Sequence, residues 1–138
     1  MKSEPDAFSW TQQVARDVEP WTGVRSHQAR NNLAAMRLGD RALFYHSNIG
    51  KEIVGVVEVA RAAYPDPTAG SDAKAGHWVC VDMQAKGAFT VPVTLASLKA
   101  DSRFADLALV RLSRLSVSPV SETHWRLITE MGGWKEPA

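Results

Sequence analysis

Side chains that could recognise a nucleic acid gather between Trp21 and Asn48. This stretch, WTGVRSHQARNNLAAMRLGDRALFYHSN, combines aromatic rings, amides and guanidinium groups. From residue 24 to residue 51 there are five basic side chains and one acid, Asp40, although the whole chain has 16 basic and 15 acidic residues. A basic, amide-rich and aromatic surface can hold phosphates, read a base edge and stack on a base. A solvated helix followed by an edge strand fits the same residues equally well.

Separate residues of this stretch suit separate parts of such a task. Trp21 and Tyr45 could each stack on a base, which is worth about 1–3 kcal/mol per base. Amide side chains such as Gln28 and Asn48 offer a donor and an acceptor to a base edge. We predict phosphate contacts for three arginines, Arg25, Arg30 and Arg37. Each aromatic ring alone is more typical of a protein core, so their concentration in one stretch is what favours binding.

Other kinds of chemistry find less support. The four histidines and Cys80 lack the spacing of a zinc site, so we predict no metal and no cofactor. Ser47 directly follows His46, and neighbours on a strand point to opposite faces, which argues against a Ser–His pair. Cys80 lies between two valines and is predicted to be a small buried apolar residue. Glu4 and Asp6 could form an acid–base pair, but the proline between them favours a turn.

The bulk composition is that of an ordinary globular protein. With 138 residues, 45% of them hydrophobic and 22% charged, we predict a single domain over residues 1–138. A net charge of +1 requires any nucleic-acid binding to come from a local patch. One cysteine, no signal peptide and no apolar run near the roughly 18 residues of a membrane span favour a cytosolic protein, or a nuclear one in a eukaryote. We expect a monomer without a membrane partner.

Several short elements must position these residues. A capping box at Ser9 predicts a helix to about residue 18, ended by Pro20. Apolar spacing predicts a second helix over residues 27–37. Strands are predicted over 41–46 and 52–64, paired as a hairpin with a bulge at Gly55, then over 78–86, 88–93 and 114–117. Shorter helices are expected at 94–98 and within 104–110, and a last one from Ser121 to the glycine pair at 132–133. Residues 64–77 read as a loop.

These elements predict a mixed α+β domain around a curved sheet or small barrel. Most strands follow one another too closely for parallel β-α-β crossovers, which favours antiparallel pairing. Periodicity alone leaves the choice between an open sheet and a barrel undecided.

The ordered motifs of the chain resemble those of a known family. The strings MKSEPD, WTGVRSHQARNNLAAMRLGD, FYHSN, IVGVVEVARAAYPDPT and WVCVD follow one another, and the likeness continues to about Trp125. This pattern is similar to the EVE domain family, small PUA-like domains of the thymocyte nuclear protein type. The resemblance implies a PUA-like twisted β-barrel of mixed strands with short helices covering its ends. It also implies kinship with the YTH and ASCH domains.

The resemblance further implies a pocket that accepts a modified base of DNA or RNA, with modified cytosine in DNA as the leading candidate. Carried over by motif, the pocket residues are Ser3, Glu4, Trp21, Arg25, Gln28, Tyr45, His46, Ser47 and Asn48. Two departures from the family pattern bear on this pocket. Family members usually have an aromatic half-strand of the type YWL before MKSEP, whereas this sequence opens at Met1. Ser26 and His27 stand where an asparagine and an aromatic residue are common.

We therefore interpret the chain as a non-catalytic module that accepts an unstacked modified base. Taking a base out of a stack costs a few kcal/mol, which stacking on Trp21 or Tyr45 could offset. One alternative is an ASCH-like hydrolase that acts on nucleic acid or a modified nucleoside, with His46 or Glu4 as its acid–base group. Another is a small-molecule or protein-interaction module that has kept the fold and lost the ligand.

Overall fold

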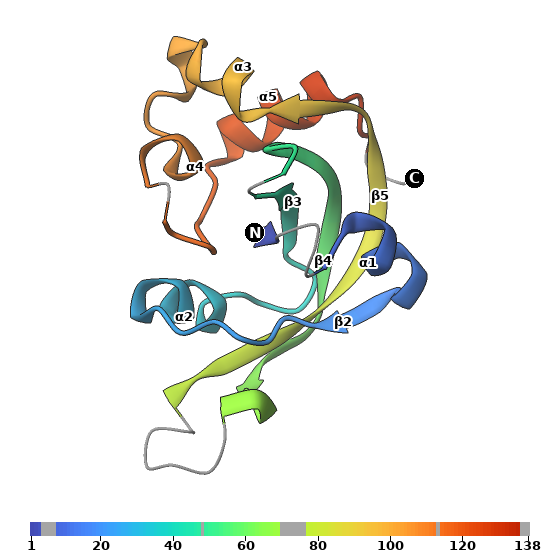
Figure 1. Cartoon of the computed structure of the whole chain (residues 1–138), viewed down its shortest axis with the longest axis vertical. Coiled ribbons are helices and arrows are strands. Elements are labelled where there is room, and N and C mark those ends of the chain that lie inside the picture. The colour runs from blue at the N-terminus through green and yellow to red at the C-terminus, as the bar shows by residue number, and fades with distance from the viewer. Residues whose placement is uncertain (4–7, 48, 70–76, 113, 136–138) are drawn as a thin grey trace.

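Two long antiparallel strands form the spine of the molecule (Figure 1). In this computed structural model, which describes residues 1–3, 8–47, 49–69, 77–112 and 114–135, β4 (Glu52–Pro65) pairs with β5 (Val79–Thr94). On its other edge, β4 pairs with β3 (Arg41–His46), also antiparallel. The predicted hairpin between FYH and the Val-rich strand is thus confirmed.

Two short strands complete the sheet at its edges. β1 (Lys2–Ser3) runs parallel to β3, and β2 (Val18–Pro20) runs antiparallel to β5, which gives the order β1-β3-β4-β5-β2. The mixed α+β class is confirmed, but the sheet is not closed into the expected barrel. Its edge strands are only two and three residues long and are not paired with each other, so the curved sheet remains open along one seam.

The predicted bulge at Gly55 is present, and the ring of Trp10 gives a further reason for a glycine at this position. The register of β4 shifts between Ile53 and Gly55 against β5, and β3 shows a matching shift opposite these residues. The ring of Trp10 lies directly on Gly55, where an added Cβ would come within 2.5 Å of the indole carbons. Only glycine allows this close approach of ring and backbone. Gly55 therefore seats α1 (Trp10–Arg16) against the sheet.

Replacing Gly55 with alanine should lower the free energy of unfolding by about 1–3 kcal/mol, because the new methyl group overlaps the Trp10 ring. Urea unfolding followed by far-UV circular dichroism measures this change. Removing the ring in a Trp10→Ala background should make Gly55→Ala cost much less, as expected for residues in direct contact. An equal cost in both backgrounds would show that the overlap does not matter.

The helices surround this sheet in two groups. Figure 1 shows α3 (Leu95–Lys99), α4 (Ala108–Arg111) and α5 (Glu122–Gly132) gathered at one end of the β4–β5 pair, with α1 and α2 (His27–Ala34) near its middle. The predicted caps are confirmed: Ser9, Thr94 and Ser121 each accept a backbone hydrogen bond, and Gly133 ends α5 in the left-handed conformation. No helix in the described part of the chain is long and apolar enough to span a membrane.

Several predicted elements differ from the observed ones. The helix predicted over 27–37 ends earlier, at Ala34. The strands expected at 78–86 and 88–93 are one continuous strand, β5, whose register shifts replace the expected break. Val18–Pro20 pairs with β5 as β2 rather than ending a helix. Within 114–117 the described residues form no strand, although the Lys2 amide donates to the Ser116 carbonyl. Leu115 and Val117 are buried, so their alternation with polar residues reflects packing rather than strand pairing.

Strand alternation divides the core into two clusters on opposite faces of the sheet. Along β3, Phe44 packs in the first cluster with Trp21 and Leu33, whereas Leu43 and Tyr45 pack in the second cluster. The first cluster lies beneath α1 and α2, and the second lies beneath α3 to α5. Residues that follow each other on β3 therefore serve different sides of the molecule.

Candidate functional site

A hollow of about 490 Å³ lies along the open seam of the sheet. Both edge strands contribute to it, β1 through Lys2 and Ser3 and β2 through Glu19 and Pro20. We call it the Trp21 hollow; its remaining lining residues are Phe8, Arg16, Trp21, Thr22 and Gly23. Its volume lies within the range of about 300–1,000 Å³ that is usual for ligand pockets.

Two aromatic rings form the apolar wall of the Trp21 hollow. The ring centroids of Phe8 and Trp21 lie 6.4 Å apart at an interplanar angle of 86°, an edge-to-face contact. Trp21 also meets Phe44 edge to face at 5.6 Å and is only 8% exposed, so most of its ring belongs to the core. Phe8 is half-buried and carries more of the open aromatic surface. A flat, apolar ligand could therefore lie against Phe8 and the exposed edge of Trp21.

Charged side chains also line the Trp21 hollow. The Arg16 guanidinium is 2.9 Å from the Glu19 carboxylate and lies over the Phe8 ring at 5.4 Å from its centroid. Lys2 borders the same hollow, and burial lowers the pKa of its ammonium group. Cations could hold a phosphate here, and the Glu19 carboxylate could accept a hydrogen bond from an amino group. The hollow thus has two cations and one carboxylate, which is paired with Arg16, next to an aromatic wall.

Ser3 connects the segment before α1 to the hollow. Its hydroxyl donates to the carbonyl of Phe8, and its own carbonyl accepts from the Ser47 amide at 2.8 Å. These bonds fix the backbone that carries Phe8 next to β1. Glu4, predicted beside Ser3 in the pocket, lies outside the described residues, as does Asn48. Ser47 is half-buried in the turn that follows β3 and does not line the Trp21 hollow.

His46 lies on the Phe44 side of β3 and supports α1. Its Nε2 atom accepts a hydrogen bond from the Trp10 amide at 3.0 Å, and its ring meets Phe44 at 5.7 Å. An Nε2 atom that accepts a hydrogen bond cannot carry a proton. Burial lowers the pKa of His46, although the Glu52 carboxylate acts in the opposite direction. His46 does not line the hollow and acts as a neutral anchor for the start of α1.

The stability of the protein should therefore fall as the pH drops below about 6.5, the ordinary pKa of histidine. A base whose pKa is lowered by folding binds more protons in the unfolded state, so acid favours unfolding through the range between the two pKa values. Urea unfolding at pH 7.5 and 5.5 measures this loss. In His46→Gln, whose amide oxygen could still accept from Trp10, the loss should be smaller.

The contribution of His46 is separated from that of other titrating groups as follows. The buried α-amino group of Met1, whose pKa falls to about 5 through burial and the charge of Lys2, contributes equally to both proteins and cancels in the difference. His124→Gln, at a partly exposed position on α5, provides the control histidine variant. An unchanged pH dependence in His46→Gln would contradict the assignment.

Tyr45 is on the opposite face of the sheet from Trp21. It lines a larger hollow of about 760 Å³, together with Met1, Met36 and Trp125 among others, which we call the Tyr45 hollow. Tyr45 is 4% exposed, and burial raises the pKa of its hydroxyl. The predicted pocket is therefore divided, because alternation along β3 sends Tyr45 and Phe44 to opposite faces. Ser3 and Trp21 come together as predicted, whereas Tyr45 does not join them.

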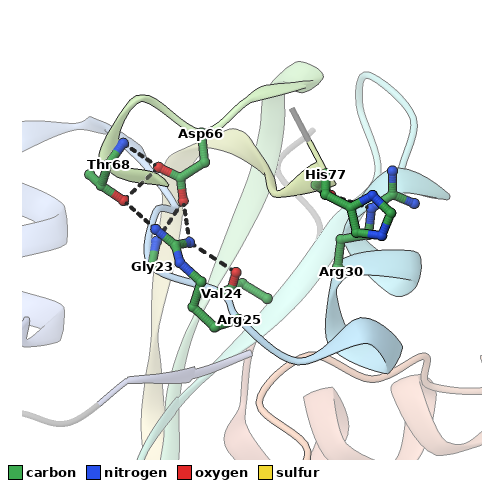
Figure 2. A network of polar contacts seen from close by, with 7 residues as sticks. All are labelled: Gly23, Val24, Arg25, Arg30, Asp66, Thr68 and His77. Atoms are coloured by element: carbon green, nitrogen blue, oxygen red, sulfur yellow. Dashed lines mark hydrogen bonds and ion pairs between the residues drawn. The ribbon is translucent and has the colours of Figure 1, made fainter. Parts of the chain in front are cut away.

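The residues predicted to lie on or near α2 are also dispersed. Gln28 is exposed on α2 and lines neither hollow. Arg30 donates from Nε to the His77 carbonyl at 2.7 Å, and Arg37 is exposed beyond the end of α2. Arg25 instead points toward Asp66, with its Nη1 atom 3.0 Å from the carboxylate, as Figure 2 shows. Of the three guanidinium groups, only that of Arg25 has a carboxylate partner within the described residues, although the Arg37 backbone amide donates to the Asp40 carboxylate at 2.9 Å.

Of the residues that line the hollow, the sequence predicts only Ser3 and Trp21 as site residues. Phe8, Arg16 and Glu19 precede the stretch that the sequence singles out, and only the fold brings them to Trp21. Asp66, in the YPDPT string, falls in the loop predicted over 64–77, yet its side chain is fully buried. An acid between two prolines, next to a Val-rich strand, was the available signal. Among the described residues, no three potential metal ligands lie together.

Comparisons with known proteins agree with this architecture. The family model described as the EVE domain matches residues 1–131. An uncharacterized protein from Schizosaccharomyces pombe is 31% identical over 94% of this chain, which spans only 61% of that relative's length. Human thymocyte nuclear protein 1 is 30% identical over the whole chain, which covers 74% of it.

Solved structures give the same result. A protein from Rhodopseudomonas palustris is 56% identical, with a TM-score of 0.89 over 96% of this chain and 90% of its own. Human thymocyte nuclear protein 1, in complex with 5-methylcytosine-containing DNA, has a TM-score of 0.90 at 30% identity over 99% of this chain and 97% of its own. The chain is similar to thymocyte nuclear protein 1 across its whole length, and it belongs to the EVE domain family.

Proposed function

We propose that this domain binds DNA and holds a modified cytosine, unstacked from its neighbours, in the Trp21 hollow. The observation that carries the proposal is an aromatic, cation-rimmed hollow of about 490 Å³ at the open seam of the sheet. The human relative bound to 5-methylcytosine-containing DNA supports the choice of ligand, because its fold matches this chain over 99% of its length.

The chemistry of the hollow suits a cytosine ring. Extrusion of a base costs a few kcal/mol, and stacking against Phe8 and the edge of Trp21 offsets part of this cost. The exocyclic amino group of cytosine donates hydrogen bonds, and the carboxylate of Glu19, which lines the hollow, can accept one. A 5-methyl group adds apolar surface that the aromatic wall can bury, which favours the modified base by the hydrophobic effect.

The surrounding charges suit the DNA backbone. Lys2 and Arg16 border the hollow, and Arg30 and Arg37 lie along and beyond α2. Since the whole chain has a net charge of only +1, these local cations supply the attraction to phosphates. Such contacts position the strand without reading its sequence, and the hollow then selects the base.

We further propose that the domain is not an enzyme. The hydrolase alternative has His46 or Glu4 as its acid–base group, and Glu4 lies outside the described residues. His46 accepts a backbone hydrogen bond from Trp10 and does not line the hollow. Incubation of the protein with modified and plain oligonucleotides, followed by chromatography of the products, checks this proposal. Turnover that disappears in His46→Ala would replace binding with hydrolysis as the function.

Titration of the intact chain against matched oligonucleotides tests the binding proposal. The panel contains plain cytosine, 5-methylcytosine and 5-hydroxymethylcytosine at one position, in single- and double-stranded DNA and in RNA. Fluorescence anisotropy at 50 and 200 mM salt should show preference for a modified cytosine by about tenfold, equivalent to about 1.4 kcal/mol. Equal affinity for modified and plain cytosine at both salt concentrations would refute the proposal.

A further inference from the structure

The buried carboxylate of Asp66, directly after the end of β4, is hydrogen-bonded to the wall of the Trp21 hollow. Asp66 follows β4 directly, and its side chain has no exposed surface. Its Oδ2 atom accepts from the Gly23 amide at 2.8 Å and from Arg25 Nη1 at 3.0 Å. Its Oδ1 atom accepts from the Thr68 amide at 2.7 Å and from the Thr68 hydroxyl at 2.6 Å. Both oxygens are therefore satisfied within the protein, as Figure 2 shows.

These bonds hold the segment that forms one side of the hollow. Trp21, Thr22 and Gly23 line the hollow, and Gly23 has a φ of +86°, which side chains other than glycine rarely allow. The Trp21 amide donates to the Val81 carbonyl at 2.7 Å, which ties the start of the segment to β5. Asp66 ties its end, because Gly23 has a backbone N–H that points at the carboxylate.

The charge of Asp66 is compensated locally. Burial would raise the pKa of its carboxyl group, but hydrogen bonds from Thr68, Gly23 and Arg25 outweigh burial and lower it. Arg25 uses its guanidinium inside this network, since Nη1 also donates to the Val24 carbonyl and Nη2 donates to the Thr68 hydroxyl. A buried carboxylate that loses such a partner is strongly unfavourable, so the arginine and the aspartate depend on each other.

We propose that Asp66 is a positioning residue that fixes the Trp21–Gly23 wall in the geometry that selects a modified base. The proposal rests on the proposed function for its ligand, a nucleic acid carrying a modified cytosine. In this arrangement the Arg25 guanidinium neutralises the charge of Asp66, and other cations make the phosphate contacts. Gly23 and Asp66 are 43 residues apart in the sequence, so the hydrogen bond between them forms only in the folded domain.

Asp66→Asn tests this role with little change in shape. The matched control is Asp101→Asn, which weakens a second aspartate–arginine pair, between Asp101 and Arg103 at 2.7 Å, in a segment that lines neither hollow. The proposal expects Asp66→Asn to reduce the preference for 5-methylcytosine by about tenfold, with affinity for plain DNA changed less than about threefold. Asp101→Asn should leave both unchanged, and Thr68→Val should show a smaller loss than Asp66→Asn. Circular dichroism establishes that each variant is folded.

Two further readouts separate positioning from other roles. Gly23→Ala is unsuitable because of the positive φ, so the Gly23 amide is followed directly by NMR hydrogen exchange. Its exchange should be faster by about tenfold or more in Asp66→Asn than in the wild type or in Asp101→Asn. In Arg25→Gln, the preference for the modified base should fall while the salt dependence of binding stays the same. A phosphate anchor would instead reduce the salt slope by about one.

The outcomes distinguish this proposal from the proposed function. Wild-type protein without base preference refutes the function, whereas the exchange of the Gly23 amide still decides whether Asp66 fixes the wall. Unchanged Gly23 exchange in Asp66→Asn overturns the positioning role. Unchanged base preference in a folded Asp66→Asn variant, with a selective wild type, overturns it as well.

Discussion

Phe44→Ala should lower the free energy of unfolding by about 3–5 kcal/mol, the usual cost of truncating a buried phenylalanine. Phe44 has no exposed surface, and its ring meets those of Phe8, Trp10 and Trp21 at 6.4, 5.3 and 5.6 Å. Removal of the ring leaves a cavity among the three aromatic side chains that pack against it. Urea unfolding at pH 7.5 measures the loss, which is a large part of the 5–15 kcal/mol typical of a domain.

Phe104→Ala is the matched control for this prediction. Phe104 is equally buried but packs in the second cluster, on the other face of the sheet, so its removal should cost a similar amount of stability. The two variants should differ in binding, because only Phe44 supports the rings of the Trp21 hollow. At a temperature where both are folded, Phe44→Ala should lose preference for modified cytosine and Phe104→Ala should keep it. Equal loss in both would mean that the hollow does not depend on Phe44.

Local patterns predicted the elements that carry their own signals. The capping box at Ser9, the glycine stop at the end of α5 and the Val-rich β4 strand each follow from residues a few positions apart. The bulge at Gly55 was also predictable, because glycine inside a strand weakens pairing unless a special geometry requires it. The ring that requires it, Trp10, lies 45 positions earlier in the sequence and could not be identified from the pattern.

The candidate site could be predicted only in part, because it is built from contacts distant in sequence. Ser3 and Trp21 share a hollow as the family motifs implied, but Tyr45 faces the other way. Alternation along β3 forbids neighbours from sharing a face, so Phe44 in the first cluster already excluded Tyr45 from it. Arg25 is a similar case: a basic residue in an amide-rich stretch reads as a phosphate ligand, and only the fold shows its partner, Asp66.

Variants of the hollow and of α2 should affect DNA binding in different ways. Phe8→Ala and Trp21→Phe reduce the stacking surface, so most of the tenfold preference for modified cytosine, equivalent to about 1.4 kcal/mol, should be lost. Trp21→Phe keeps an aromatic ring in the core and Phe8 is only half-buried, so both variants should fold. Affinity for plain DNA and its salt dependence should change little, because neither residue is charged.

Arg30→Glu should have the complementary effect. Loss of a phosphate contact weakens binding to all oligonucleotides alike and lowers the salt slope by about one, while the ratio between modified and plain cytosine is kept. Arg126→Glu, at an exposed position on α5, provides the control charge reversal and should change neither quantity. If Arg30→Glu changed the base ratio, or Phe8→Ala changed the salt slope, anchoring and base selection would not be separate. The hollow and α2 would then act as one surface, and the division of labour inferred from their positions would fail.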